Sequence, residues 1–137
     1  MKLSNTSEYA IRILSFMAKE PEHKYSAKYL VETLAISDKY LRRLMTDLSK
    51  AGFIKSSQGR DGGYSFSKKI NEIILSDIID SVEGMEKYIG CVLGFPKCSD
   101  ENPCVMHSAW TNVRKEFINT FQNKTLADFD YSEIYKY

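Results

Sequence analysis

Three segments in the first fifty residues carry apolar side chains at the spacing of an amphipathic helix. The first covers residues 6–19, with Ser7 as its expected N-cap. The second follows Ser26, and the third covers residues 38–50 with Ser37 as its cap. Their expected buried faces are Ala10, Ile13, Leu14 and Met17, then Leu30, Val31 and Leu34, then Leu41, Leu44, Met45 and Leu48. The short turn between the second and third segments is typical of a helix-turn-helix.

Directly after the third helix the pattern changes from helical to alternating. Gly52 lies where a helix-ending glycine is expected. Residues 53–57 and 64–67 indicate two strands, with a glycine-rich turn over residues 58–63 between them. A hairpin in this place is the wing of a winged helix, and it puts Arg60 at its tip. A plain surface hairpin with a solvated arginine is the alternative.

The second half of the chain contains a short helix, an irregular loop and a long helix. Residues 75–84 indicate the short helix, capped by Ser76 and ended by Gly84. The loop that follows holds Pro96 and Pro103, which disfavour regular structure. Residues 105–123 indicate the long helix, whose apolar stripe comprises Val105, Ala109, Val113, Phe117 and Phe121, with Trp110 and Ile118 beside it. We expect this stripe to form a homodimer interface, with packing on its own domain as the alternative.

These elements predict a mainly α fold with a small β-hairpin, a winged helix-turn-helix with a long C-terminal dimerisation helix. The expected divisions are a DNA-binding domain over 1–69, a connecting helix and cysteine loop over 70–104, and the dimerisation helix with a polar tail over 105–137. The 137 residues are 43% hydrophobic, which suits one compact domain with an appended helix. No apolar run approaches the roughly 18 residues of a membrane span, and the N-terminus shows no secretory signal, so we expect a cytoplasmic protein without membrane contact.

The formal net charge of +1 conceals two oppositely charged halves. Residues 1–69 hold 13 Lys and Arg against 7 Asp and Glu, whereas residues 70–137 hold 6 against 11. A basic half favours a polyanionic partner, which we expect to be double-stranded promoter DNA with a pseudo-palindromic operator. The candidate DNA contacts are Lys39, Arg42 and Arg43, Arg60 in the wing, and Ser37 and Tyr40 through backbone or base-edge contacts. Ordinary charge scatter and a winged helix used only for protein contacts are the alternatives.

All three cysteines of the chain, Cys91, Cys98 and Cys104, lie within 14 residues. An odd number of thiols cannot close into intramolecular pairs, and soft thiolates suit iron–sulfur clusters, zinc or copper(I). The gaps of six and five residues exceed the two to four usual at structural zinc sites, which favours a cluster. His107 and Glu8 are both candidates for a fourth ligand, Glu8 from the same chain or from a partner subunit.

Two other functions remain open for these residues. A clusterless regulator would use the thiols for oxidation or zinc binding. An enzyme with Cys104 and His107 as nucleophile and base is disfavoured, because the sequence offers no orienting acid, oxyanion motif or substrate pocket. Buried thiols without any ligand are the simplest alternative.

In this order of elements the chain resembles the IscR/NsrR family of bacterial regulators over residues 1–122. The resemblance rests on Ser-Glu-Tyr-Ala-Ile-Arg at 7–12, on the segment 37–44, on Gly-Arg-Asp-Gly-Gly-Tyr at 59–64, and on the cysteines. It implies a homodimeric regulator, expected to be a repressor, that senses nitric oxide, redox or iron–sulfur status through a 2Fe–2S or 4Fe–4S cluster. It implies Cys91, Cys98 and Cys104 as ligands, with His107 or Glu8 as the fourth. The first gap has six residues, whereas the best-known members have five or fewer.

Overall fold

The computed structural model describes residues 2–133. The helices and strands are, in order, α1 (Asn5–Ala18), α2 (Ala27–Leu34), α3 (Asp38–Lys50), β1 (Ile54–Ser57), β2 (Gly63–Phe66), α4 (Leu75–Val82), α5 (Glu86–Ile89) and α6 (His107–Gln122), with short 3₁₀ turns η1 (Ile70–Glu72), η2 (Leu126–Asp128) and η3 (Tyr131–Glu133). This confirms a mainly helical fold with one two-stranded hairpin. Among residues 2–133, no helix has the length and apolar character needed to cross a membrane.

Serine side chains start the first three helices. Ser26 and Ser37 accept hydrogen bonds from the backbone N–H groups of the third residue beyond them, as predicted. The prediction of Ser7 as the first cap is wrong, because Ser4 is the N-cap and accepts from the Ser7 backbone N–H. Ser7 is instead fully buried within α1. The cap therefore lies three residues earlier than predicted, and α1 begins at Asn5 rather than at residue 6.

The core lies where α1, α2 and α3 meet, and the predicted apolar faces supply most of it. Its fully buried side chains include Ile13, Leu14, Met17, Leu30, Leu41, Leu44, Met45 and Leu48. Gly52 follows α3 with a φ of +86°, a left-handed conformation that costs glycine little. Each fully buried Leu or Ile contributes on the order of 1.5–3 kcal/mol relative to an exposed one. This core fixes the position of α3.

The wing is an antiparallel hairpin whose second strand is anchored to the segment before α2. Strands β1 and β2 pair from Ile54 with Phe66 to Ser57 with Gly63. Tyr64 also exchanges two backbone hydrogen bonds with Tyr25, of 2.8 and 2.7 Å. A Cβ on Gly63 would lie 2.6 Å from the Tyr25 carbonyl oxygen, so this close approach requires glycine. The segment before α2 thus sets the angle of the wing.

Helix α4 and the turn η2 extend the same core beyond residue 69. Ile73, Leu75 and Ile78 are buried against α1 and α3. Leu126 is fully buried there too, and its backbone N–H donates to the Ile73 carbonyl at 3.1 Å. The prediction of Ser76 as the cap of α4 is wrong, because Ile74 occupies that position and Ser76 is buried. The chain therefore returns to the helical core after α6.

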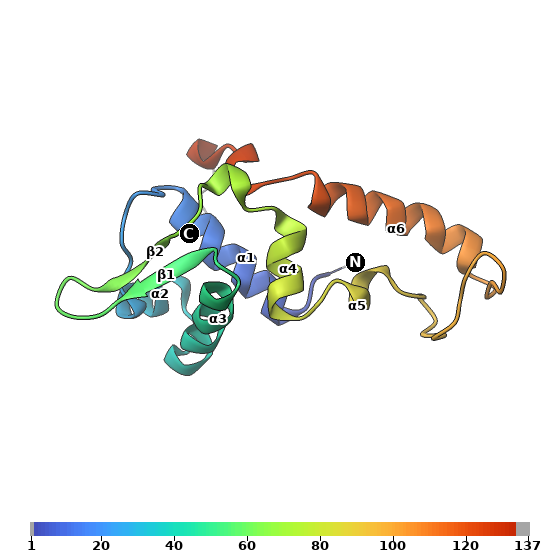
Figure 1. Cartoon of the computed structure of the whole chain (residues 1–137), viewed down its shortest axis with the longest axis horizontal. Helices are drawn as coiled ribbons and strands as arrows, with labels where there is room; N and C mark the ends of the chain where they lie inside the picture. Colours follow the sequence, from blue (N-terminus) through green and yellow to red (C-terminus); the bar gives the residue numbers. More distant parts are fainter. Residues whose placement is uncertain (1, 134–137) are drawn as a thin grey trace.

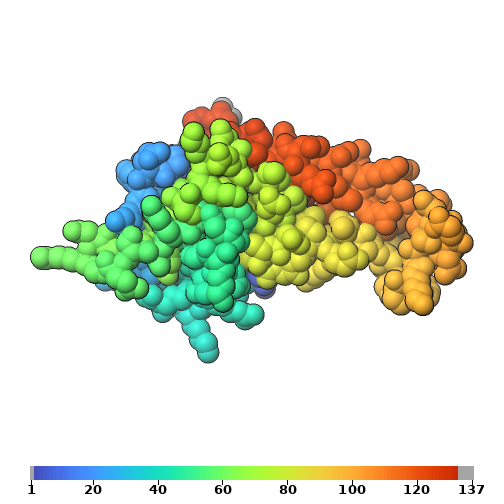
Figure 2. Space-filling view, viewed as in Figure 1, coloured from blue at the N-terminus to red at the C-terminus, as the bar shows by residue number. Residues whose placement is uncertain are grey.

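Helix α5, the cysteine loop and α6 form an arm that projects from the core (Figure 1). The four-residue α5 was not predicted. Helix α6 begins at His107 rather than at residue 105, and Val105 is 89% exposed. Of the predicted stripe, Phe117 is buried, whereas Val113 remains 48% exposed. In the space-filling view the wing, α3 and the cysteine loop are separate projections (Figure 2).

Candidate cysteine site and DNA-binding surface

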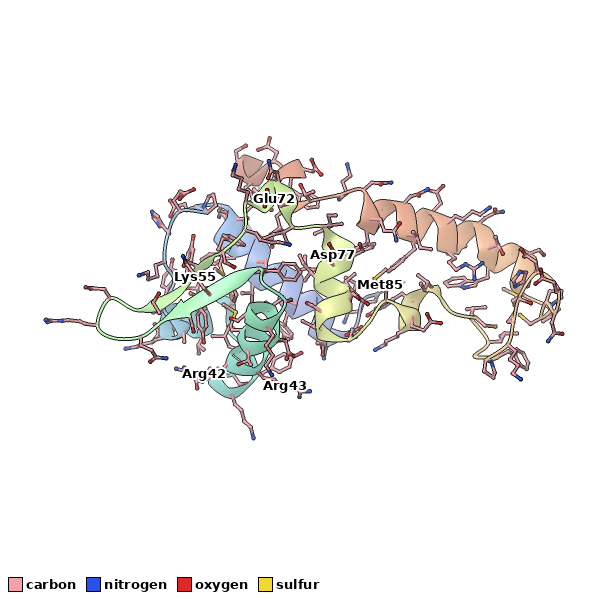
Figure 3. All side chains as sticks on the ribbon, viewed as in Figure 1. Arg42, Arg43, Lys55, Glu72, Asp77 and Met85 are labelled. Atoms are coloured by element: carbon pink, nitrogen blue, oxygen red, sulfur yellow. The ribbon has the colours of Figure 1, made fainter. Side chains whose placement is uncertain are left out.

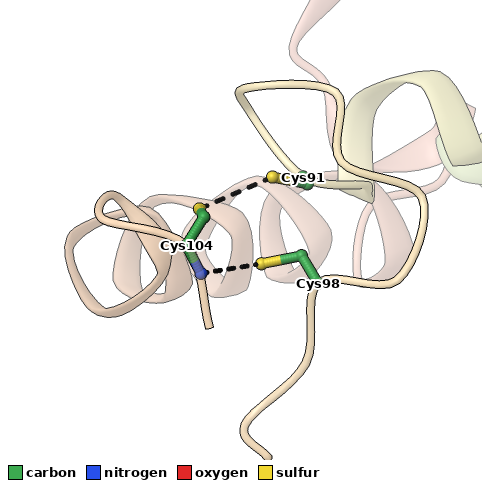
Figure 4. A group of neighbouring side chains, drawn as sticks. All are labelled: Cys91, Cys98 and Cys104. Atoms are coloured by element: carbon green, nitrogen blue, oxygen red, sulfur yellow. Dashed lines mark hydrogen bonds between the residues drawn. The ribbon is translucent and has the colours of Figure 1, made fainter. Parts of the chain in front are cut away.

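The cysteine loop brings its three thiols together. The three Sγ atoms lie within 4.8 Å of one another. The Sγ atoms of Cys91 and Cys104 are 3.6 Å apart, and the backbone N–H of Cys104 donates to Cys98 Sγ at 3.4 Å (Figure 4). Residues 13 positions apart in sequence thus lie close together, and their role as metal ligands stays a prediction.

The arm holds both ends of this loop in place. At its start, Trp110 Nε1 donates to the Gly90 carbonyl at 2.8 Å, and Arg114 donates to the Ile89 carbonyl at 3.4 Å. At its end, the His107 backbone N–H donates to the Cys104 carbonyl at 3.1 Å. These bonds satisfy carbonyls at the end of α5 and tie the loop to α6. Trp110, which the sequence indicates only as an apolar residue, is thus also a polar anchor.

His107 lies beside the three cysteine thiols. Its Nδ1 is 3.2 Å from Cys98 Sγ, and its Nε2 is 2.8 Å from Asp100 Oδ1. The His107 side chain is 12% exposed. The hydrogen bond to His107, together with the charge of that ring, lowers the pKa of Asp100. No sequence motif singled out Asp100, because its relation to His107 depends on the bend between them.

Glu8 lies elsewhere in the chain. It is on α1, where its carboxylate pairs with Lys2 Nζ at 3.3 Å and with Arg12 Nη2 at 3.5 Å. The group of candidate metal ligands found among residues 2–133 contains the three cysteines, and neither Glu8 nor His107. His107 Nδ1 nevertheless lies 3.2 Å from Cys98 Sγ, whereas the contacts of Glu8 are with α1 and Lys2. Of the two candidates for a fourth ligand, the chain places only His107 beside the thiols.

Two of the thiols have shifted pKa values. Desolvation acts to raise the pKa of Cys91, but hydrogen bonds from the backbone of Phe95 and Leu93 and from the other thiols lower it to about 7. A backbone hydrogen bond from Cys104 acts to lower the pKa of Cys98, yet desolvation and the neighbouring thiols raise it. Near neutral pH, Cys91 is therefore the thiol of these two that more readily forms a thiolate. The thiolate is the form that binds soft metals.

Apolar side chains surround the thiols on one side. A hollow of about 600 Å³ lies against Cys98 and Cys104, and it is lined mainly by Leu93, Phe95, Pro96, Pro103 and Val105. Three thiolate sulfurs and one imidazole nitrogen form a donor set suited to an iron–sulfur cluster or to zinc. The residues present therefore fit a cluster or a soft metal ion.

The predicted cations of α3 are exposed on one side of the molecule. Lys39, Arg42 and Arg43 all lie on the surface, and Figure 3 shows Arg42 and Arg43 on the outer part of α3. Arg42 Nε contacts both carboxylate oxygens of Asp38, at 3.1 and 3.0 Å. Exposed pairs of this kind contribute little to stability, so Arg42 can exchange Asp38 for phosphate at small cost.

Two other predicted DNA contacts have structural partners. The Ser37 hydroxyl caps α3, and Tyr40 donates its hydroxyl to Thr6 Oγ1 at 3.2 Å while its ring meets Tyr9 edge-on. Arg60 is exposed in the wing turn, as predicted. Lys55, which was not among the predicted contacts, is also exposed, on β1. Its outward position follows from the alternation of side chains along a strand.

Comparisons with known proteins agree with this architecture. Residues 3–130 match the model of the family Rrf2, described as an iron-dependent transcriptional regulator. The chain belongs to the Rrf2 family. The protein Rrf2 of Nitratidesulfovibrio vulgaris is 33% identical over 129 residues, which cover 93% of this chain and 86% of that protein. The family match confirms the predicted resemblance to regulators of the IscR/NsrR type.

Two solved structures show the same fold. T. potens IscR superposes with a TM-score of 0.76 at 27% identity, covering all of this chain and 94% of the other. CymR, the global cysteine regulator of B. subtilis, superposes with a TM-score of 0.77 at 28% identity, covering 93% and 95%. This Rrf2 protein is therefore a winged-helix, DNA-binding transcriptional regulator, and not an enzyme.

Proposed function

We propose that this Rrf2 protein is a cytoplasmic repressor whose promoter binding is controlled by an iron–sulfur cluster. Cys91, Cys98 and Cys104 hold the cluster, and His107 completes the set. The observation that carries the proposal is the convergence of three Sγ atoms within 4.8 Å, with His107 Nδ1 3.2 Å from one of them. When bound, the cluster supplies a centre that nitric oxide, oxidants or shortage of iron and sulfide can alter or remove.

DNA binding in this proposal belongs to α3 and the wing. A homodimer presents two α3 helices to successive major-groove half-sites of a pseudo-palindromic operator. Lys39, Arg42 and Arg43 make base and phosphate contacts there, and Arg60 contacts the backbone or minor groove. Lys55 adds a phosphate contact. The half-exposed apolar face of α6 at Val113 supports a dimer through this helix.

A continuous set of contacts joins the cysteine loop to α3. Tyr88 of α5 lies three residues before Cys91 and stacks on Phe117 of α6, with ring centroids 5.4 Å apart. The Tyr88 hydroxyl accepts from the Ser4 backbone N–H at 2.9 Å, at the cap of α1. On the first turn of α1, two residues after Ser4, Thr6 accepts from Tyr40 of α3. A change in the loop therefore has a physical route to the recognition helix, and measured coupling between the two sites is the test of that route.

Glu8 enters the proposal only as a residue of a second copy. Its carboxylate sits at the start of α1, near the cap that Tyr88 contacts, and its ion pairs with Lys2 and Arg12 are partly exposed. A partner's Glu8 would then replace or supplement His107 at the thiols. Retention of cluster iron in a Glu8→Gln variant would leave His107 as the fourth ligand.

The test is an absorption spectrum of protein purified without oxygen, together with its iron and sulfide content. Brown protein with charge-transfer bands at about 300–600 nm is expected, from thiolate-bound iron. Cys98→Ala should lose these bands, and Lys97→Ala, in the same loop, should keep them. Protein that stays colourless after anaerobic reconstitution with iron and sulfide would contradict the proposal that the chain binds an iron–sulfur cluster.

A second candidate function is a thiol- or zinc-responsive regulator. Two observations favour it, namely the likeness to the cysteine regulator CymR and the 3.6 Å between Cys91 Sγ and Cys104 Sγ. Colourless wild-type protein with about one zinc per chain, or with operator affinity that changes on thiol oxidation, would support this candidate.

A further inference from the structure

The carboxylate of Asp100 is within hydrogen-bonding distance of the His107 ring, although Asp100 lies on an exposed part of the cysteine loop. Its Oδ1 lies 2.8 Å from His107 Nε2, although the Asp100 side chain is 90% exposed. The opposite side of the same ring faces the thiols, with Nδ1 3.2 Å from Cys98 Sγ. An exposed ion pair contributes little to folding stability, so this contact calls for an explanation other than stability.

The two nitrogens of a histidine ring are linked by the proton they share. When Nε2 carries the proton and donates it to a carboxylate, Nδ1 keeps its lone pair and is free to bind a metal. Without such an acceptor, both neutral tautomers and both ring orientations become accessible. Asp100 is therefore placed to select the form in which Nδ1 presents a lone pair to the thiols.

The backbone on both sides of this contact is already fixed. His107 donates its backbone N–H to Cys104 and accepts a hydrogen bond from the Thr111 hydroxyl at 2.7 Å. Asp100 lies in a bend closed by reciprocal backbone hydrogen bonds between Ser99 and Asn102, of 3.2 and 3.1 Å. The remaining freedom is the rotation of the His107 ring, and the Asp100 carboxylate restrains that rotation.

We propose that Asp100 is a positioning residue, which fixes His107 so that Nδ1 becomes the fourth ligand beside the three thiolates. The identity of the bound group rests on the proposed function. The orientation of His107 does not, since it is a property of the cluster-free chain. This separates the two proposals experimentally.

The first measurement uses cluster-free protein with ¹⁵N-labelled histidine. The chain has two histidines, so His23 serves as the internal reference. Wild type should carry the ring proton on His107 Nε2, as should Asp100→Asn, whose side-chain oxygen still accepts. Asp100→Ala should give a mixture of tautomers, and Glu101→Ala, which removes the neighbouring acid, should match wild type. A proton on Nδ1 in wild type, or an unchanged tautomer in Asp100→Ala, would overturn the proposal.

The second measurement follows loss of iron from reconstituted protein to a chelator. Asp100→Ala should lose iron at least about tenfold faster than Glu101→Ala, as expected when the partner of a metal-ligating histidine is removed. Asp100→Asn should lie close to wild type, and the melting temperatures of the cluster-free proteins should agree. Equal rates for Asp100→Ala and Glu101→Ala would overturn the proposal. Wild type that binds no iron would instead defeat the proposed function, and the tautomer experiment would still decide the role of Asp100.

Discussion

The Tyr88 hydroxyl lies 2.9 Å from the backbone nitrogen of Ser4, and joins the arm to the first helix of the core. The same hydroxyl donates to Glu83, which also accepts from the Ser4 hydroxyl. Ser4 is the N-cap of α1, and Tyr88 is three residues from the first cysteine. One small polar group thus links the end of α4, the start of α1 and the approach to the cysteine loop.

Replacing Tyr88 by phenylalanine should destabilise the protein while keeping the ring stacked on Phe117. The change leaves the Ser4 backbone N–H without this acceptor and removes one of the donors to Glu83, at a cost of about 1–3 kcal/mol in the free energy of unfolding. Urea denaturation measures it. The control is Tyr29→Phe, whose side chain is 50% exposed and which should change stability little.

The same variant tests the proposed route between loop and recognition helix. If coupling passes through Tyr88, the ratio of operator affinities with and without the cluster should move toward one in Tyr88→Phe. Tyr29→Phe should keep the wild-type ratio. Labelled operator DNA is titrated with Tyr88→Phe and with Tyr29→Phe, each with and without the cluster, which gives the four affinities. A wild-type ratio in Tyr88→Phe would show that coupling takes another path.

Glu83 should make stability depend on acid pH. Desolvation opposes its charged form, but hydrogen bonds from Ser4 and Tyr88 and the charge of Lys87 lower its pKa below the ordinary 4.5. The unfolded chain then binds the proton first, so this stabilisation is complete above pH 4.5 and disappears as pH falls through the lower folded pKa. Glu83→Gln should therefore be less stable than wild type at pH 7, and the difference should shrink below pH 4.5. A constant difference in chemical denaturation from pH 7 to pH 3 would contradict this role.

Gly63→Ala should detach the wing from the core. The added Cβ would meet the Tyr25 carbonyl oxygen at 2.6 Å, so the two backbone hydrogen bonds between Tyr25 and Tyr64 cannot both persist. We expect a loss of about 1–3 kcal/mol in stability and weaker operator binding. Gly59→Ala is the control, since its Cβ would have open space and only the backbone conformation is strained. Equal losses in both variants would mean that contact with Tyr25 is not decisive.

Arg60→Ala should weaken operator binding and leave stability unchanged. Arg60 is exposed in the wing turn, and loss of a base or narrow-groove contact costs on the order of 1–3 kcal/mol in binding free energy. Lys115→Ala removes an equal charge from α6 and should have a smaller effect. Operator affinity measured over a range of salt concentrations separates a specific contact from general attraction. Unchanged affinity in Arg60→Ala would remove this residue from the interface.

Local pattern was enough to predict much of this molecule. Helical spacing identified the cores of α1, α2 and α3, because an amphipathic helix repeats its buried positions within a few residues. Ser26, Ser37 and Gly52 were predictable as helix ends for the same reason, since caps act over one turn. The alternating segments at residues 53–57 and 64–67, with the glycine-rich turn between them, predicted the wing. The three cysteines by themselves indicated a site for a soft metal.

Features that depend on residues distant in sequence were decided only by the tertiary structure. Ser4 became the cap of α1 because the start of the chain packs beside α4 and α5, which the apolar repeat does not reveal. Four-residue α5 is too short for any period to show, and it is held by Trp110 and Arg114 from α6. The Asp100 contact that orients His107 likewise arises from a bend. The sequence thus determined most of the helices and the gathering of three cysteines in one loop, since those properties are local. Only the packing of the arm decided that His107 lies beside the thiols, since that depends on where separate segments meet in space.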